Sequence, residues 1–248
     1  MRILVSNDDG LSGGGLIPLI NILGTMGEVY AVVPDAEKSA SSHSITLHKP
    51  IRLIKKEENI YTVTGTPSDC VRFGIMGIMK YKLDLVVSGI NDGPNLGEDC
   101  IYSGTVAAAR EGAMMGYRSM AVSLVSGNGR HFDIAAKMTL EIIKIFEKIS
   151  IPQKSFLNLN IPDTTKIKGI KITRMGRRIY DEDIDERIDP RGGKYYWIGG
   201  EKLSGHQTPG TDIYAVGRKF VSVTPLKVDQ TDYMFHKKIQ HSVKTFKK

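Results

Sequence analysis

The chain has 248 residues, 41% of them hydrophobic, which is enough to bury a substantial core as one large domain or as a domain with an appendage. No run of about 18 apolar residues and no signal-peptide pattern occurs, which excludes a membrane-spanning helix and predicts a cytoplasmic location. The net charge is +7, but five lysines and no acid lie between Met234 and Lys248, so most of the excess belongs to a terminal segment without a recognised nucleic-acid-binding motif.

A first strand is predicted at residues 3–5, an apolar run that leads directly into Asn7, Asp8, Asp9 and Gly10. Gly10 permits the sharp exit that a strand needs before the next element. Asp8 and Asp9 are therefore expected at the carboxyl end of a central strand, which is the edge where open α/β sheets bind ligands. The alternative is that residues 7–10 form an ordinary solvated turn.

Short apolar runs then alternate with helical patterns up to residue 150. Further strands are expected at residues 29–33, 83–88 and 120–124, and another extended segment ends at 64–66. Helices are expected at about residues 16–24, 66–80, 103–114 and 132–149. Strands that alternate with helices predict an α/β fold in which residues 1–150 form a doubly wound, mostly parallel core.

The pattern changes after residue 150. Strands at 156–161 and 169–173 follow without a long intervening helix, and then come a charged stretch, an aromatic hairpin and further strands, at residues 174–191, 195–198 and 220–224. Residues 151–248 are thus expected to form an α+β extension with a C-terminal helix, used in oligomerisation. The aromatic side chains of the hairpin would pack either on a partner subunit or on their own domain.

A divalent cation is expected at the carboxyl ends of the strands. Asp8 and Asp9 repel each other when both are ionised, and a cation between them relieves that repulsion. Ser39 follows the second strand and Asn91 follows the strand at 83–88, so both can reach the same edge. Oxygen donors without Cys or His favour magnesium, manganese or calcium over zinc or copper. The two cysteines lack metal-site spacing and are expected to be small apolar residues.

A phosphate site is expected beside this cation. Ser103, Gly104 and Thr105 open a helix, where backbone amides and two hydroxyls can bind phosphate oxygens, and Asn95 lies in the preceding loop. The alternative is that Ser103 or Thr105 only caps the helix and that residues 91–95 only form a turn. A cation beside a phosphate site indicates phosphoryl chemistry.

Other phosphate-binding schemes fail at specific residues. Residues 10–15 are rich in glycine but lack the Lys-Ser/Thr ending of a P-loop, and their glycines lack the G-x-G-x-x-G spacing of a dinucleotide site. A phosphoacceptor receiver domain also has paired acids after its first strand. It would need a further aspartate at the end of the third strand, where this chain has Ser88.

A series of short segments, in order along nearly the whole chain, matches the motifs of one known family. The segments are MRILVSNDDG at 1–10, VPD at 33–35 with Ser39 and HSIT at 43–46, GTPSDCV at 65–71, SGIN at 88–91 through NLG at 95–97, YSGTV at 102–106, and VSVTPL at 221–226. The chain therefore resembles the survival protein E (SurE) family of metal-dependent nucleotidases. The loop that carries Ser39 departs from the usual family pattern on either side of Pro34-Asp35, at Val33 and Ala36, and the lysine-rich end after Asp232 matches no family motif.

The resemblance implies a Rossmann-like core with one divalent cation per subunit, Mg²⁺ or Mn²⁺, held by Asp8, Asp9, Ser39 and Asn91. It implies hydrolysis of nucleoside 5′-monophosphates to nucleoside and phosphate, with 3′-monophosphates as further candidate substrates. It also implies a homodimer or homotetramer in which carboxyl-terminal segments exchange between subunits. No nucleic-acid partner and no membrane partner are expected.

The expected catalytic residues are Asp8 and Asp9. Asp8 would either attack phosphorus or orient a metal-bound water. His43 is a candidate acid toward the leaving hydroxyl, and a hydrogen-bonding or surface role is the alternative. A nucleotide-binding regulatory protein without turnover is the alternative function, and salt-dependent nucleic-acid binding through the lysine-rich end is the third.

Overall fold

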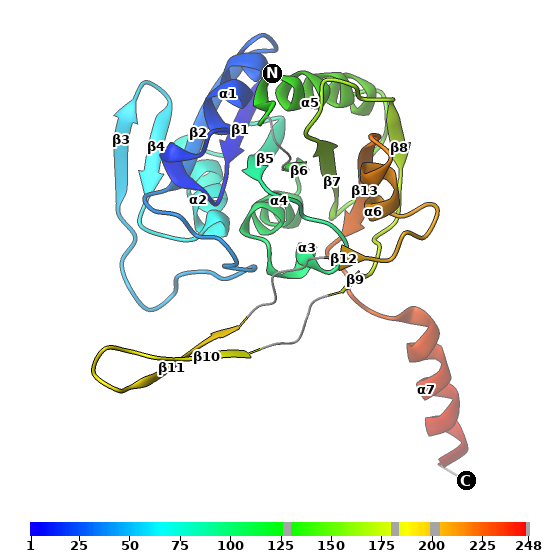
Figure 1. The fold of residues 1–248 in the computed structure, drawn as a ribbon. Coiled ribbons are helices and arrows are strands. Elements are labelled where there is room, and N and C mark those ends of the chain that lie inside the picture. The colour runs from blue at the N-terminus through cyan, green and yellow to red at the C-terminus, as the bar shows by residue number, and fades with distance from the viewer. Residues whose placement is uncertain (126–129, 180–183, 199–203, 247–248) are drawn as a thin grey trace.

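The computed structural model of the chain describes residues 1–125, 130–179, 184–198 and 204–246. Its centre is a nine-stranded sheet with the strand order β3-β4-β2-β1-β5-β6-β7-β13-β8 (Figure 1). The strands are β1 (Arg2–Ser6), β2 (Glu28–Pro34), β3 (Leu53–Glu57), β4 (Ile60–Val63), β5 (Leu85–Asp92), β6 (Arg118–Val125), β7 (Ser155–Pro162), β8 (Ile170–Ile172) and β13 (Val221–Lys227). Neighbours pair in parallel except β3 with β4 and β13 with β7, so the expected mostly parallel sheet is confirmed.

Helices cover both faces of this sheet (Figure 1). They are α1 (Leu16–Gly24), α2 (Pro67–Phe73), α4 (Gly104–Met114) and α5 (Phe132–Phe146). Ile3 and Val5 of β1 join α1 and α5 in one buried cluster, whereas Leu4 between them joins α2 and α4 in another. Because a strand with apolar side chains on both faces must be covered on both sides, β1 takes a central position. This is the doubly wound architecture that the alternating sequence pattern predicts.

The ends of three elements differ from the expected ranges. The helix that starts at Pro67 ends at Phe73 and continues as the π-helical turn η2 (Gly74–Ile78), and α5 ends at Phe146 rather than near residue 149. β5 runs on to Asp92, with a shift in register against β6 between Ser88 and Asn91. Asn91 therefore lies within the strand and not in the loop after it, because β6 continues to pair with the chain past Ser88.

The sheet continues across the expected domain boundary at residue 150. β7 pairs with β6, and β13 and β8 then extend the same sheet. Leu157, Leu159 and Ile161 of β7 belong to the same buried cluster as Ile3 of β1, which gives the two halves of the chain a shared core. The remaining elements of the body are short: η1 (Gly10–Ser12), α3 (Asp99–Tyr102), β9 (Arg178–Ile179), β12 (Ser204–Gly205) and α6 (Asp212–Gly217).

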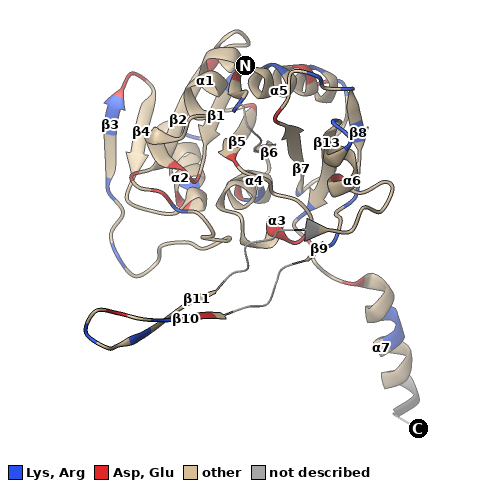
Figure 2. Ribbon diagram, viewed as in Figure 1, with Lys and Arg blue, Asp and Glu red and all other residues tan. Residues whose placement is uncertain are grey.

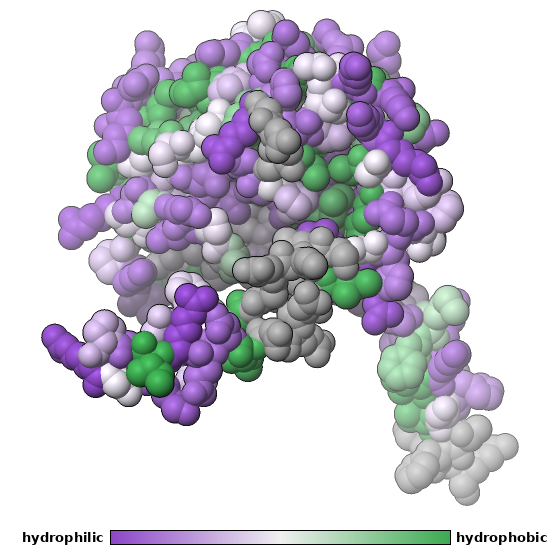
Figure 3. Space-filling model, viewed as in Figure 1, coloured by the Kyte–Doolittle hydropathy of each residue, from purple (hydrophilic) through white to green (hydrophobic). Residues whose placement is uncertain are grey.

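Two elements project from the body of the molecule (Figure 1). They are the hairpin of β10 (Ile184–Ile188) with β11 (Lys194–Ile198), and the C-terminal helix α7 (Tyr233–Phe246). Hydrophobic residues are visible on the surface of both (Figure 3), and Trp197 and Phe235 are about 60% exposed. As far as the described residues show, the aromatic hairpin thus does not pack on its own domain. Residues 180–183 of the expected charged stretch, and Lys247 and Lys248 of the basic end, lie outside the described residues.

Both cysteines are buried and free, as expected for small apolar residues. Cys70 belongs to the cluster beneath α2, and the Cys100 thiol donates to the carbonyl oxygen of Asn95 over 3.4 Å. Among the helices that the structure describes, none combines the length and the apolar composition needed to cross a membrane.

Candidate active site

A cleft of about 490 Å³ opens at the carboxyl ends of β1, β2 and β5. Many of the predicted site residues line it, namely Asp8, Asp9, Ser39, Asn91, Asn95 and Ser103. Segments far apart in the sequence meet here because parallel strands end at the same edge of the sheet. Gly104, Thr105 and His43 are not among the lining residues.

A side-chain clamp shapes the turn that presents Asp8 and Asp9. The side-chain Nδ2 of Asn7 donates to the Gly10 carbonyl over 2.8 Å, and the backbone amide of Gly10 donates back to Asn7 Oδ1 over 3.0 Å. Gly10 adopts φ +73°, and a Cβ added to Gly13 would lie 2.7 Å from Asp9 Cβ, so both positions require glycine. Asn7 was missed as a positioning residue, although an Asx turn after an apolar strand is a signal that could have identified it.

Asp8 is buried and held by the start of α4. The Thr105 amide donates to Asp8 Oδ2 over 3.1 Å, and the Thr105 hydroxyl donates to Oδ1. Burial raises the pKa of Asp8, and these two hydrogen bonds from Thr105 act in the opposite direction. Gly104 permits this approach, because a Cβ there would lie 3.0 Å from Asp8 Cβ and 2.7 Å from Ser41 Oγ. Thr105 thus positions Asp8 in this structure, and contacts of Gly104 or Thr105 with phosphate stay predictions.

Asp9 lies beside Asp8 and has an unsatisfied carboxylate oxygen. Its Oδ2 is buried and has no hydrogen-bond partner among the described residues. Burial, followed by the negative charges of Asp8, Glu37 and Asp92, raises the pKa of Asp9 to about 6. A cation at this point would offset all four of these unfavourable contributions.

The cleft is strongly acidic. Glu37, Asp92 and Asp99 line it together with Asp8 and Asp9, and acidic residues are visible at the end of β5 and in α3 (Figure 2). Sequence reasoning missed Asp92 and Asp99, which stand close to the predicted Asn91 and Asn95. Glu37 was likewise not predicted as a site residue. A run of acids after several strands of one sheet edge is the signal that could have found them.

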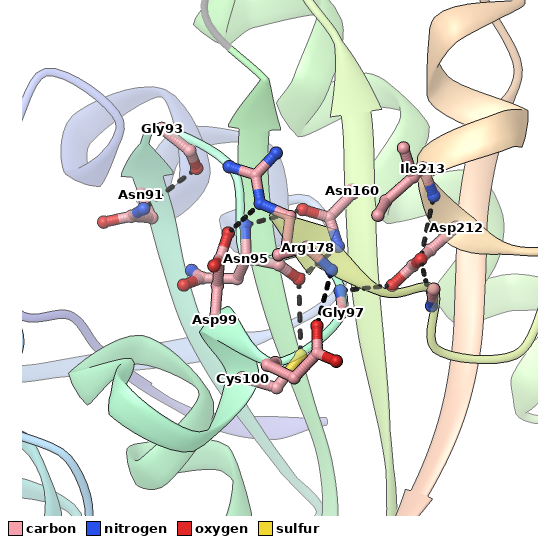
Figure 4. A network of polar contacts seen from close by, with 12 residues as sticks. Asn91, Gly93, Asn95, Gly97, Asp99, Cys100, Asn160, Arg178, Asp212 and Ile213 are labelled. Carbon is pink, nitrogen blue, oxygen red and sulfur yellow. Dashed lines mark hydrogen bonds and ion pairs between the residues drawn. The ribbon is translucent and has the colours of Figure 1, made fainter. Parts of the chain in front are cut away.

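The predicted cation ligands fit a hard divalent ion by chemical type. Within the described residues no group of three or more His, Cys, Asp or Glu is arranged to hold a metal, so amide and hydroxyl oxygens are needed beside Asp8 and Asp9. Asn91 Nδ2 donates to the Gly93 carbonyl over 2.9 Å, which leaves Oδ1 on the opposite side of the amide group (Figure 4). This orientation suits an oxygen ligand.

Ser39 reaches the cleft on a docked loop. The Lys38 amide donates to the Asp8 carbonyl over 2.7 Å and so attaches the loop to the end of β1. The Ser39 hydroxyl itself donates to Glu37 Oε1 over 2.8 Å. Glu37 is thus a second oxygen donor at this position, and a cation contact through Ser39 stays a prediction.

Asn95 and Ser103, the two predicted phosphate contacts that line the cleft, both have structural partners. Ser103 Oγ accepts from the Val106 amide over 3.0 Å and caps α4, as the alternative interpretation had it. Asn95 Nδ2 donates to Ser123 Oγ over 2.8 Å, and the Asn95 main chain is bonded on both sides by Asn158 and Asn160. Asparagines inside the buried strand β7 were an unused sequence signal that polar partners must lie nearby.

A second polar cluster holds the wall of the cleft that contains Asp99 (Figure 4). Asp212 accepts from three backbone amides, those of Gly97 over 2.8 Å, Gly176 over 2.7 Å and Ile213 over 2.8 Å. Arg178 forms an ion pair with Asp99, with Nε 2.9 Å from Oδ2. Residues from the C-terminal half of the chain therefore fix the loop between β5 and α4.

His43 lies outside the cleft. Its Nε2 is 2.9 Å from Glu111 Oε2, and the other oxygen of Glu111 is 2.7 Å from Arg72 Nη2. Burial raises the pKa of Glu111, but the hydrogen bond from His43 and the charge of Arg72 outweigh it and hold that pKa below its usual value. This arrangement corresponds to the hydrogen-bonding alternative for His43.

Known proteins resemble this chain over nearly its whole length. The family described as Survival protein SurE matches residues 3–182. A protein named 5′-nucleotidase SurE from Geotalea uraniireducens (strain Rf4) is 45% identical to this chain, and the match covers 94% of this chain and 95% of that protein. A protein of the same name from Pelotomaculum thermopropionicum is 44% identical over 100% of this chain and 97% of its own length.

Solved structures agree with the sequence relatives. The crystal structure of the SurE protein from Aquifex aeolicus superimposes with a TM-score of 0.86 at 41% identity, over 97% of this chain and 99% of that one. The family match, the relatives and the shared fold all cover most of the chain. The chain therefore belongs to the survival protein SurE family.

Proposed function

We propose that this chain hydrolyses nucleoside 5′-monophosphates to nucleoside and phosphate with the help of one divalent cation, Mg²⁺ or Mn²⁺. The relatives that match over nearly full length carry the name 5′-nucleotidase SurE. The observation that carries the cation part is the buried Asp9 oxygen, which has no partner in the described part of the chain and lies next to the buried carboxylate of Asp8. Such an arrangement costs free energy in a fold unless a cation completes it.

Asp8, Asp9, Ser39 and Asn91 would hold the cation. When bound there, it would withdraw charge from the phosphate group of the ester. Thr105 keeps Asp8 in one orientation at the cleft, which favours either direct attack on phosphorus or orientation of an attacking water.

Asn95 and the turn at 103–105 would contact the remaining phosphate oxygens. Asn95 is held rigidly by its neighbours, so a contact from it would need no reorganisation when substrate binds. Nucleoside 3′-monophosphates are further candidate substrates, since all the proposed contacts would go to the phosphate group and none to the sugar.

The test is phosphate release from adenosine 5′-monophosphate in the presence of manganese, with wild-type protein and Asp8→Asn. We expect turnover by the wild type. In Asp8→Asn we expect the rate of phosphate release to fall by about 10³-fold or more, because the variant lacks the carboxylate beside the reacting phosphate. Circular dichroism and the melting temperature check that the variant is folded. Nucleotide binding without phosphate release by the wild type would instead support a regulatory protein.

The two projecting elements support oligomerisation. Residues 151–248 would supply the contacts, because the β10–β11 hairpin and α7 expose large apolar side chains such as Ile198 and Met234 away from the body. A homodimer or homotetramer would cover them. Light scattering on the full chain distinguishes these states from a monomer, which would contradict this part of the proposal. A cytoplasmic location stays a prediction.

A further inference from the structure

The charge of the cleft poses a difficulty for an anionic substrate. Five carboxylates line it, those of Asp8, Asp9, Glu37, Asp92 and Asp99. A phosphate monoester carries a charge of about −1.5 to −2 at neutral pH. One divalent cation neutralises only part of the negative charge of the lining, so the remainder repels the substrate. A cationic side chain at the cleft would therefore have a marked effect on substrate binding.

Arg130 is the only Lys or Arg among the described residues that line the cleft. It stands just before α5, on the segment that follows β6, and neither the apolar patterning nor the family motifs draw attention to it. An arginine suits a phosphate because its planar guanidinium can donate two parallel hydrogen bonds to phosphate oxygens.

The backbone of Arg130 is fixed by a buried carboxylate. The Arg130 amide donates to Asp163 Oδ2 over 2.7 Å, and the His131 amide donates to Asp163 Oδ1 over 2.8 Å. The His131 ring nitrogen Nδ1 lies 2.6 Å from the same Oδ1. The side chain of Asp163 is completely buried, so the residue that follows β7 anchors the start of α5. The point from which the arginine side chain extends is thus set by the sheet.

The side chain of Arg130, in contrast, is held weakly. It is 73% exposed, and its Nε lies 3.5 Å from Asp92 Oδ2, which is a long ion pair at the rim of the cleft. Exposed pairs of this kind contribute little to stability. The guanidinium can therefore exchange one anionic partner for another at low cost.

We propose that Arg130 is a substrate-binding residue whose guanidinium exchanges its contact with Asp92 for the phosphate group of a nucleotide entering the cleft. This inference rests on the proposed function. It adds a cationic phosphate contact from the segment before α5, on the side of the cleft away from the start of α4. The bland alternative is that Arg130 only forms a surface ion pair, in which case its removal would not affect phosphate binding.

The experiment measures binding of inorganic phosphate to the manganese-loaded protein by titration calorimetry, for wild type, Arg130→Ala and Arg130→Lys. We expect the dissociation constant to rise by about tenfold to a hundredfold in Arg130→Ala, the range of a charge-assisted hydrogen bond. Arg130→Lys should recover part of this loss, because it keeps the charge but not the bidentate geometry. Lys137→Ala is the matched control, since it removes one positive charge from the exposed surface of α5.

Steady-state kinetics with adenosine 5′-monophosphate add a second readout. For Arg130→Ala we expect KM to rise by about the same factor as the phosphate dissociation constant, with kcat within about threefold of wild type. Equal phosphate affinity in wild type and Arg130→Ala would overturn the inference, as would an equal loss in Lys137→Ala or no phosphate binding by the wild type. Failure of the proposed function would appear separately, as phosphate binding by the wild type without turnover.

Discussion

Two corners of the molecule bury aspartates in opposite ways. Asp212 is completely buried, and its two oxygens accept hydrogen bonds from three backbone amides. At the end of β1, Asp8 is similarly satisfied by Thr105, but the adjacent Asp9 has a buried oxygen for which the described residues offer no partner. A carboxylate whose acceptors are all used stabilises the fold, whereas one with an acceptor left over costs free energy that a ligand can recover.

The surroundings of the two aspartate sites differ in the same way. Asp212 joins the loop after β5, the segment before β9 and the start of α6, which are three separate parts of the backbone. The Asp8–Asp9 corner instead faces the cleft and three further carboxylates. We therefore assign Asp212 to the architecture of the site and the β1 corner to its chemistry, and the variants below separate these roles.

The largest effect on stability is expected for Asp212→Asn. The new amide nitrogen would face at least one backbone N–H that now donates to a carboxylate oxygen, so a buried donor would lose its acceptor. We expect the free energy of unfolding to fall by about 3 kcal/mol, measured by urea denaturation. Asp8→Asn is the comparison variant and should change stability by less than about 1 kcal/mol, because the lost hydrogen bond is offset by removal of a buried charge. Equal losses in both variants would break the distinction between the two corners.

A smaller loss is expected for His43→Ala, which tests a third buried carboxylate. Glu111 would lose the hydrogen bond from His43 but keep its ion pair with Arg72. We expect a decrease in the free energy of unfolding of about 1–2 kcal/mol. The pH dependence of kcat should keep its shape, because His43 does not line the cleft. Loss of one limb of that pH profile, with stability unchanged, would instead identify His43 as the acid.

The smallest effect is a gain in stability for Asp9→Asn without metal. The folded-state pKa of Asp9, about 6, lies above the value of an unfolded aspartate, so the folded state binds the proton more tightly. The contribution of Asp9 to wild-type stability therefore falls as pH rises from about 4 to about 6 and then stays level, whereas Asn does not titrate. We expect Asp9→Asn to be more stable by about 1 kcal/mol at pH 8, after allowance for the partial exposure of Asp9.

Thermal unfolding in a chelating buffer at pH 4 and pH 8 measures this gain. The difference between Asp9→Asn and wild type should be near zero at the lower pH and largest at the higher. Asp35→Asn serves as the control, because it removes an exposed carboxylate at the end of the neighbouring strand β2. A variant less stable than wild type at pH 8 would mean that Asp9 supports the fold, as Asp212 does.

Much of the fold followed from patterns that span only a few residues. The apolar run at 3–5 predicted β1, and Thr66, Pro67 and Asp69 predicted the start of α2, where the structure has a reciprocal capping box. The hairpin of β3 and β4 and the continuation of the sheet through β7, β13 and β8 were not predicted. Strand partners are chosen by packing across the sheet, and local patterns do not contain that information.

For the site, the sequence alone determined that Asp8, Asp9 and Asn91 collect at one sheet edge, because each lies at or just beyond the carboxyl end of a parallel strand. Only the tertiary structure decided the partners. Thr105 bonds Asp8 across 97 positions and Glu111 bonds His43 across 68, and Arg130 reaches the cleft because Asp163 fixes its backbone. Such choices depend on which groups are left unsatisfied once the core has packed, and that balance exists only in the folded chain.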